Sequence, residues 1–118
     1  MRRYVILTHD HPRLHWDLML EVDGALRTWR LSAPPETDVE IAAEPLGDHR
    51  LAYLDYEGPV SGDRGYITRW DAGVVEWLNE DAENPHVRVR GEKLGGDLLL
   101  ERREDGKLTC RYLPGAQG

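Results

Sequence analysis

The chain has 118 residues, of which 40% are hydrophobic, and a formal net charge of −7 at pH 7. This length and composition suffice for one packed domain and exclude a chain that is disordered throughout. The acidity argues against a protein that coats nucleic acid nonspecifically, because such proteins usually present a basic surface to phosphates. Cys110 is the single cysteine and cannot form an internal disulfide, and the apolar run at residues 4–7 is too short for a signal peptide or a membrane span. We therefore expect a cytoplasmic protein with no membrane partner.

Short alternating runs of hydrophobic and polar residues, separated by turn residues, predict β-strands along the whole chain. The runs 14–22 and 25–31 flank Asp23-Gly24, and an Asp-Gly pair in this position predicts a hairpin with a two-residue turn. Further strands are predicted at residues 4–7, 39–43, 49–57, 66–70, 74–78, 86–91, 97–102 and 107–113, with a turn at 71–73 and a frayed tail at 114–118. The sequence thus predicts an all-β fold, a small antiparallel β-barrel that occupies residues 1–113 as a single domain.

A cluster of potential metal ligands lies between the first predicted strand and the hairpin. His9, His15 and Asp17 fall within nine residues. Residues two apart in a strand project from the same face, about 7 Å apart, and the loop before His15 can return His9 to the same place. Two imidazoles and a carboxylate suit manganese, iron or zinc and leave open positions for water and substrate. We expect a divalent-metal site here; a polar surface loop is the alternative.

The register of the predicted hairpin adds a cation to this site. With a two-residue turn, Asp17 lies opposite Arg30 and Met19 lies opposite Thr28, and directly opposed residues share a face. Arg30 would project beside the metal, where it could hold a phosphate oxygen; a simple salt bridge to Asp17 is the alternative. The other face would carry a hydrophobic core set: Trp16, Leu18, Leu20, Trp29 and Leu31.

Four motifs occur in order between residues 4 and 102. The first is the segment 9–29, H-D-H-P-R-L-H-W-D-L-M-L-E-V-D-G-A-L-R-T-W. The others are Asp48-His49-x-Leu51-x-Tyr53-x-Asp55-Tyr56-Glu57-Gly58, Trp70-Asp71-x-Gly73 and Gly91-Glu92-Lys93-Leu94-x-Gly96. In this combination the sequence resembles the N-terminal phosphoesterase domain family of bacterial DNA ligase D, as a stand-alone and divergent member.

The resemblance implies a β-barrel enzyme that uses Mn²⁺, or another divalent transition metal, to process the 3′ ends of DNA or RNA–DNA strands in break repair. It assigns the metal to His9, His15 and Asp17. It implies catalytic roles for His49, Tyr53 and Arg13, with His49 also contacting phosphate. A turn, core or solvated role is the respective alternative for these three residues. Asp10 is expected to orient a ligand histidine.

The sequence also departs from the family at cationic positions. Met19, Ala33 and Ile41 stand where the family has basic residues, and Arg30, Arg50 and Arg64 are the candidates to replace them as phosphate-binding groups. Two other functions therefore stay open: a catalytically degenerate module that binds metal or DNA ends, and a hydrolase of a small phosphoester. The expected partners are nucleic-acid 3′ ends and a separately encoded ligase or polymerase.

Overall fold

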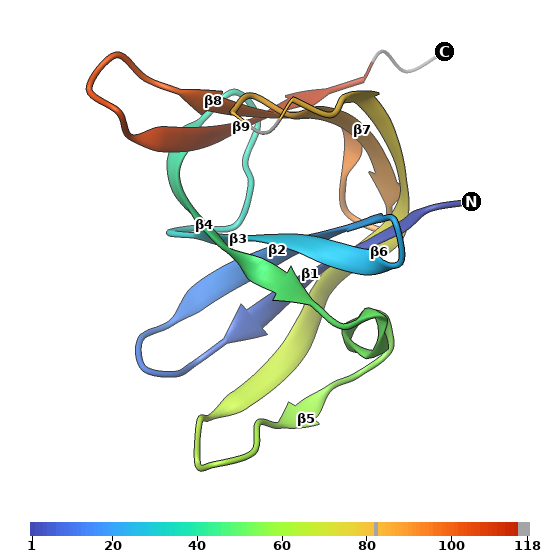
Figure 1. The fold of residues 1–118 in the computed structure, drawn as a ribbon, viewed down its shortest axis with the longest axis vertical. Coiled ribbons are helices and arrows are strands. Elements are labelled where there is room, and N and C mark those ends of the chain that lie inside the picture. The colour runs from blue at the N-terminus through green and yellow to red at the C-terminus, as the bar shows by residue number, and fades with distance from the viewer. Residues whose placement is uncertain (82, 116–118) are drawn as a thin grey trace.

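The computed structural model describes residues 1–81 and 83–115, which form a β-barrel with one short 3-10 helix (Figure 1). The elements are β1 (Arg3–His9), β2 (His15–Val22), β3 (Ala25–Leu31), β4 (Glu40–His49), η1 (Leu51–Leu54), β5 (Gly58–Pro59), β6 (Tyr66–Asn79), β7 (His86–Gly91), β8 (Gly95–Arg102) and β9 (Leu108–Pro114). No helix in the described residues has the length and apolar character needed to span a membrane.

Eight of the described strands close into a ring. Their order is β1-β2-β3-β4-β9-β8-β7-β6, and β6 pairs with β1, while β5 is added to the far side of β6. Every neighbouring pair is antiparallel. Closure gives each of the eight strands a partner on both sides, although β4 meets β9 only at Glu40–Ala42. The predicted all-β antiparallel barrel is confirmed.

The β2–β3 hairpin has the predicted register. Val22 pairs with Ala25, Asp17 with Arg30, and Met19 with Thr28. Asp23 and Gly24 both have positive φ, of 51° and 80°, as a two-residue turn of this kind requires. The predicted core set lines the barrel interior, with Trp16 packed at its margin.

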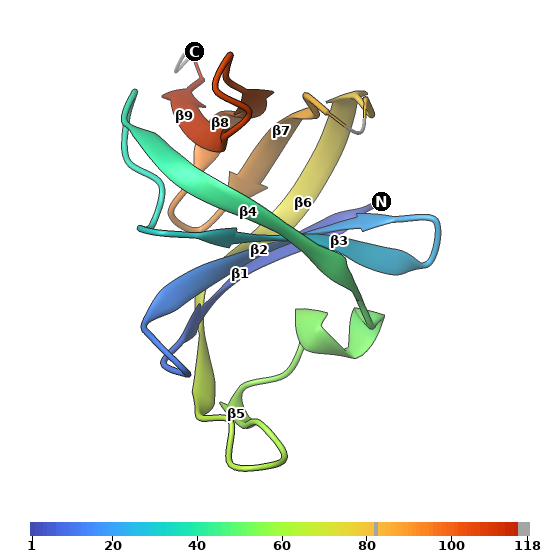
Figure 2. The same cartoon turned by 60° about the vertical axis from the view of Figure 1, so that its left-hand side comes forward.

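Strands β1 and β2 bury hydrophobic side chains on both faces. One face fills the barrel with side chains such as Tyr4 and Ile6. The other face carries Val5, Leu7 and Met19, which form a second and smaller core with residues that include Leu54 of η1. The segment from η1 through β5 therefore packs against the outside of the barrel wall, as Figure 2 shows below the ring of strands.

The strand predicted at 49–57 is wrong. Residues 51–54 form the 3-10 helix η1, in which the amide of Tyr53 donates to the Arg50 carbonyl at 3.1 Å. The alternating pattern His49-x-Leu51-x-Tyr53 resembles a strand, yet Leu54 is the buried residue of this helix. Burial of Leu54 in the second core, which the local pattern does not reveal, decides the conformation.

The turn predicted at 71–73 is also wrong, because β6 runs without a break from Tyr66 to Asn79. A register shift against β1 near Trp70 interrupts the alternation, as an extra residue in a β-bulge does. The chain does not turn at Gly73; the glycine instead allows β7 to pass close to β6. A Cβ at this position would lie 2.0 Å from the carbonyl oxygen of Arg90. The strand predicted at 39–43 is too short, since β4 continues to His49.

The C-terminal end of the described chain is part of the barrel. Pro114 is the last residue of β9, and the amide of Gly115 donates to the Gly95 carbonyl at 2.7 Å. The rest of the predicted tail, 116–118, lies outside the described residues.

The buried carboxylate of Asp71 ties the β7–β8 turn to the barrel. Its Oδ1 accepts hydrogen bonds from the amides of Glu92 and Lys93, both at 2.9 Å. Its Oδ2 accepts from the amide of Leu94 at 3.1 Å and from the Tyr4 hydroxyl. Burial and this hydrogen bond raise the pKa of Tyr4 well above its usual value. The motifs around Asp71 and residues 91–96 are thus structural.

Replacing Asp71 should destabilise the barrel strongly. In Asp71→Ala, three amides and a buried hydroxyl lose their acceptor, and each such loss costs about 1–3 kcal/mol. We expect the free energy of unfolding, measured by urea denaturation, to fall by about 3 kcal/mol or more. Glu92→Ala is the control, because Glu92 is exposed and contributes only its amide to this network. A loss in Asp71→Ala no larger than in the control would contradict the assignment.

Candidate metal centre

Strand pairing brings the three predicted metal ligands to one place. His9 pairs with His15 across the β1–β2 hairpin, and Leu7 pairs with Asp17. Because paired residues share a face, and residues two apart in a strand also share one, all three side chains leave the outer face of the barrel wall. This is the face that η1 and β5 cover.

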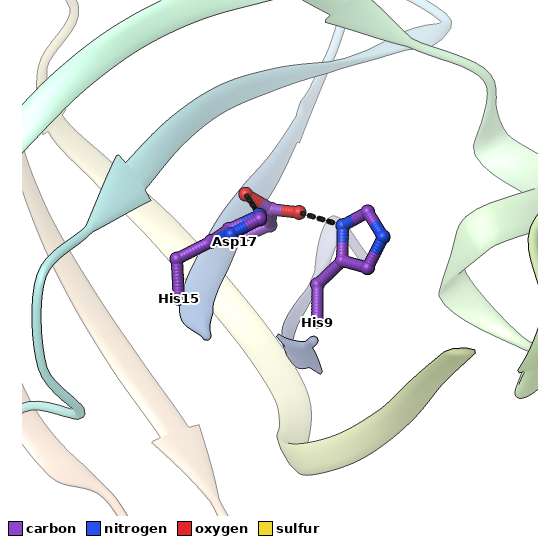
Figure 3. A group of neighbouring side chains, drawn as sticks. All are labelled: His9, His15 and Asp17. Carbon is purple, nitrogen blue, oxygen red and sulfur yellow. Dashed lines mark ion pairs between the residues drawn. The ribbon is translucent and has the colours of Figure 1, made fainter. Parts of the chain in front are cut away.

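The Asp17 carboxylate lies between the two imidazoles (Figure 3). Its Oδ2 is 3.6 Å from His9 Nδ1, and its Oδ1 is 3.3 Å from His15 Nε2. One ligand atom from each residue lies within 4.8 Å of the others. His15 and Asp17 are each 5% exposed, and His9 is half-buried.

Backbone carbonyls orient both histidines. His15 Nδ1–H donates to the Arg13 carbonyl at 2.7 Å, and His9 Nε2–H donates to the Arg64 carbonyl at 2.9 Å. Each bond leaves the other ring nitrogen unprotonated in the neutral imidazole, and that nitrogen faces Asp17. The predicted role of Asp10 is wrong, since its Oδ1 accepts the amide of Tyr66 at 2.8 Å instead.

The donor set fits a divalent cation. His15 Nε2 and Asp17 Oδ1 are buried and have no hydrogen-bond partner among the described residues. Two buried lone-pair atoms that face each other are unfavourable unless a proton or a cation lies between them. Two neutral imidazoles and one carboxylate are ligands that manganese, iron and zinc accept, and three protein ligands leave positions open for other groups.

A cleft of about 380 Å³ opens beside this centre. His9 and Asp17 line it from the barrel wall, and Arg30 lines it from the neighbouring strand β3. The structure brings His49 and Tyr53 to the same cleft, with ring centroids 5.5 Å apart. Two of the three predicted catalytic side chains and the predicted cation therefore share one cavity with two of the candidate ligands, His9 and Asp17.

His49 is oriented in the same way as the candidate ligands. Its Nδ1–H donates to the carbonyl of Gly47 at 2.9 Å, so that Nε2 is free to exchange a proton with a bound group. Arg64 also lines the cleft, and its guanidinium is held by Ser61 through the carbonyl oxygen, 2.7 Å from Nε.

Two predicted residues lie outside this cleft. Arg50 lines a neighbouring hollow of about 400 Å³ that also includes Tyr53. The exposed side chain of Arg13 lines a groove on the other side of His15. Sequence reasoning also missed the carbonyls of Arg13, Arg64 and Gly47 as orienting groups, because a backbone acceptor leaves no signal in the side-chain pattern.

The three positions where the resemblance leads us to expect basic residues, Met19, Ala33 and Ile41, are buried or half-buried. Met19 belongs to the second core and lines the cleft. Ile41 is buried in the barrel interior, and Ala33 packs against that interior core. Of these three positions, only Met19 faces the candidate metal centre.

Comparison with known proteins identifies the family. Residues 7–102 match the family described as the DNA Ligase D 3′-phosphoesterase domain. The multifunctional non-homologous end joining protein LigD of Pseudomonas aeruginosa is 36% identical over 110 residues, which is 85% of this chain and 13% of that protein. The LigD proteins of Mycobacterium tuberculosis and Mycolicibacterium smegmatis are 32% identical over 109 residues and 34% identical over 114 residues, respectively.

The two mycobacterial alignments cover 84% and 83% of this chain, and 14% and 15% of those proteins. The chain therefore spans about one-seventh of the length of these relatives. It belongs to the DNA ligase D 3′-phosphoesterase domain family, as the sequence motifs predict.

Gly65 should be required for the packing of the loop next to the candidate centre. A Cβ at Gly65 would lie 2.2 Å from Asp10 Oδ1 and 2.6 Å from His11 Cβ. Gly62 has a similar positive φ, 75° against 81°, but its Cβ would meet only the flexible Arg64 side chain at 3.5 Å. Both alanine variants incur the cost of the left-handed backbone, about 1–2 kcal/mol, and only Gly65→Ala adds a steric clash.

We expect Gly65→Ala to lower the free energy of unfolding in urea by at least about 1 kcal/mol more than Gly62→Ala does. Equal losses in the two variants would show that the loop does not depend on this close contact.

Proposed function

We propose that the chain is a manganese-dependent phosphoesterase that processes the 3′ ends of DNA or RNA–DNA strands during break repair. The observation that carries the proposal is the buried, unpartnered pair of His15 Nε2 and Asp17 Oδ1 beside a cleft that contains Arg30, His49 and Tyr53. Membership of the DNA ligase D 3′-phosphoesterase domain family supports the same function.

In this proposal His9 Nδ1, His15 Nε2 and Asp17 hold the cation. A bound divalent cation polarises a phosphoryl oxygen and lowers the pKa of a bound water. The hydrogen bonds to the carbonyls of Arg13 and Arg64 keep both imidazoles in the ligating orientation, which is the usual function of groups behind metal-binding histidines.

His49 is the proposed proton donor. With Nδ1–H bound to the carbonyl of Gly47, a protonated His49 presents Nε2–H to the cleft, where it can pass this proton to the leaving oxygen. The ring of Tyr53 packs edge-on against the imidazole and limits its rotation. A 3′-phosphate or a 3′-phosphodiester is the substrate that the family supports.

Arg30 is the proposed substitute for the family cation that Met19 replaces. It lies opposite Asp17 in the ladder, lines the cleft, and makes no ion pair with any residue in the described ranges 1–81 and 83–115. Its buried Nε has no hydrogen-bond partner there. The alternative expectation, a simple salt bridge to Asp17, is thus not what the structure shows. A guanidinium beside the candidate metal is placed to stabilise charge on a phosphoryl group.

A metal-dependent module that binds DNA ends without turnover is the second candidate function. The observation that favours it is that Ile41 is buried and Ala33 is half-buried against the barrel core, at two positions where the resemblance leads us to expect cations. If Arg30 does not supply the missing charge, phosphoryl transfer would be slow while binding could persist.

Mn²⁺ binding and phosphate release test the proposal together. We expect the intact chain to bind Mn²⁺ in a titration followed by electron paramagnetic resonance, and to release phosphate from a 3′-phosphorylated primer–template. His15→Ala should weaken Mn²⁺ binding at least about 100-fold and abolish release. His86→Ala is the matched control, because His86 is a half-buried histidine that pairs with Asp97 away from the cleft.

Each outcome of this experiment has a defined meaning. Mn²⁺ binding and primer–template binding without release would support the binding module. Phosphate release from small phosphoesters only would indicate that the chain is a hydrolase of a small phosphoester, the other function left open by the sequence. If His15→Ala bound Mn²⁺ as tightly as His86→Ala and the unchanged chain, the proposed metal centre would be overturned.

Replacing Arg30 separates a phosphate-binding role from a structural one. We expect Arg30→Ala to lower kcat/KM for a 3′-phosphorylated strand about 100-fold, with Mn²⁺ affinity retained. Arg30→Lys should recover part of this loss, because the charge returns without the planar fork. Arg90→Ala is the control, since Arg90 is an exposed arginine on β7 that does not line the cleft. An unchanged kcat/KM in Arg30→Ala would end the proposed role.

A further inference from the structure

A second groove begins at the candidate metal centre. Its volume is about 670 Å³, and it shares Pro12 and Arg30 with the active-site cleft, while His15 lies in its wall. The groove extends from the β1–β2 loop across β3 and β4 to Lys107 in the β8–β9 hairpin. Figure 1 shows this loop and this hairpin on the same side of the barrel. The groove therefore adjoins the cleft at Pro12 and Arg30.

Most basic side chains of the described residues already have a partner. Seven arginines form ion pairs with carboxylates: Arg2, Arg3, Arg69, Arg88, Arg102, Arg103 and Arg111. Arg27 and Lys93 lie over tryptophan rings, and Arg64 is bound to Ser61.

Five basic side chains make no such contact with a described residue: Arg13, Arg30, Arg50, Arg90 and Lys107. Three of them, Arg13, Arg30 and Lys107, line this one groove. The chain has a net charge of −7, so three basic side chains in one groove, without an ion pair to a described residue, make a local positive region on an acidic protein.

The remainder of the groove suits the sugars and bases of a strand. Leu14 is 58% exposed and lies between Arg13 and the candidate ligand His15. Pro45 adds an exposed apolar surface from β4, and Glu44 is the one acidic side chain in the lining. Lys and Arg side chains contact the phosphates of a strand without reading its sequence, and exposed apolar side chains beside them can cover a sugar or base.

We propose that this groove binds the nucleic-acid strand whose 3′ end occupies the active-site cleft. Arg13 contacts phosphates next to the metal centre, Leu14 supports the adjacent sugar or base, and Lys107 contacts a phosphate further along the strand. The direction of the strand rests on the proposed function, because that function places the 3′ end at the metal. The groove then makes activity depend on strand length.

The length dependence of activity tests this path. The long substrate is a 3′-phosphorylated single strand of about twelve nucleotides, a length that typical single-strand-binding sites cover. The short substrate is a 3′-phosphorylated dinucleotide, which is too short to extend along the groove. We expect Lys107→Glu to lower kcat/KM about tenfold more for the long substrate than for the dinucleotide. For binding of the long strand, the logarithm of the association constant decreases linearly with the logarithm of the salt concentration. In Lys107→Gln this slope should become less steep by about 0.7, as expected for one lost phosphate contact on a single strand.

Arg90→Glu provides the matched control for charge. Arg90 is also exposed and without an ion pair to a described residue, and the substitution changes the net charge of the protein by the same amount, but Arg90 lies outside the groove. We expect this variant to keep the ratio of kcat/KM for the long and short substrates.

The results separate the groove from the proposed function. If phosphate is released but Lys107→Glu and Arg90→Glu behave alike, the groove proposal is overturned while the enzyme proposal stands. If no phosphate is released from any substrate, but binding of the long strand weakens in Lys107→Glu and not in Arg90→Glu, the groove stands without the activity.

Discussion

The site depends on the antiparallel pairing of β1 with β2. That pairing sets His9 opposite His15 and Leu7 opposite Asp17, and it thereby fixes which face of the barrel wall carries the three side chains. A shift of one residue in β2 would send His15 and Asp17 into the barrel interior, and a shift of one residue in β1 would do the same to His9. Because Tyr4 and Ile6 fill the barrel from the opposite face of β1, hydrophobic burial holds the register that the candidate metal centre needs.

A second constraint comes from the small core outside the barrel. Leu54 of η1 packs with Val5, Leu7 and Met19, so the segment that follows β4 is held against the same face as the ligands. This packing carries Tyr53 to the cleft. The barrel strands thus supply a rigid wall that carries the candidate ligands, Arg30 and His49, and the short covering segment adds Tyr53.

The parts of the structure that depend on local pattern could be predicted from the sequence. The Asp23-Gly24 turn fixed the register of the hairpin, and from it followed the placement of Arg30 opposite Asp17. The convergence of His9, His15 and Asp17 followed from strand geometry and from the family motif.

The predictions that were wrong concern segments whose conformation depends on contacts with distant parts of the chain. Residues 51–54 alternate like a strand, but the second core selects a 3-10 helix, and this core has no signature within the segment. Asp71-Ala72-Gly73 predicts a turn, because the local sequence does not reveal the approach of Arg90 from β7. The carbonyls that orient the histidines could not be predicted either, because every residue type has the same backbone acceptor.

We propose that His9, His15 and Asp17 hold one divalent cation at the edge of the cleft. Anomalous diffraction at the manganese absorption edge, from crystals of the intact chain grown with Mn²⁺, tests it most directly. We expect a single strong peak within bonding distance of His9 Nδ1, His15 Nε2 and an Asp17 oxygen. No peak between these atoms, with Mn²⁺ saturating in the crystal, would contradict it.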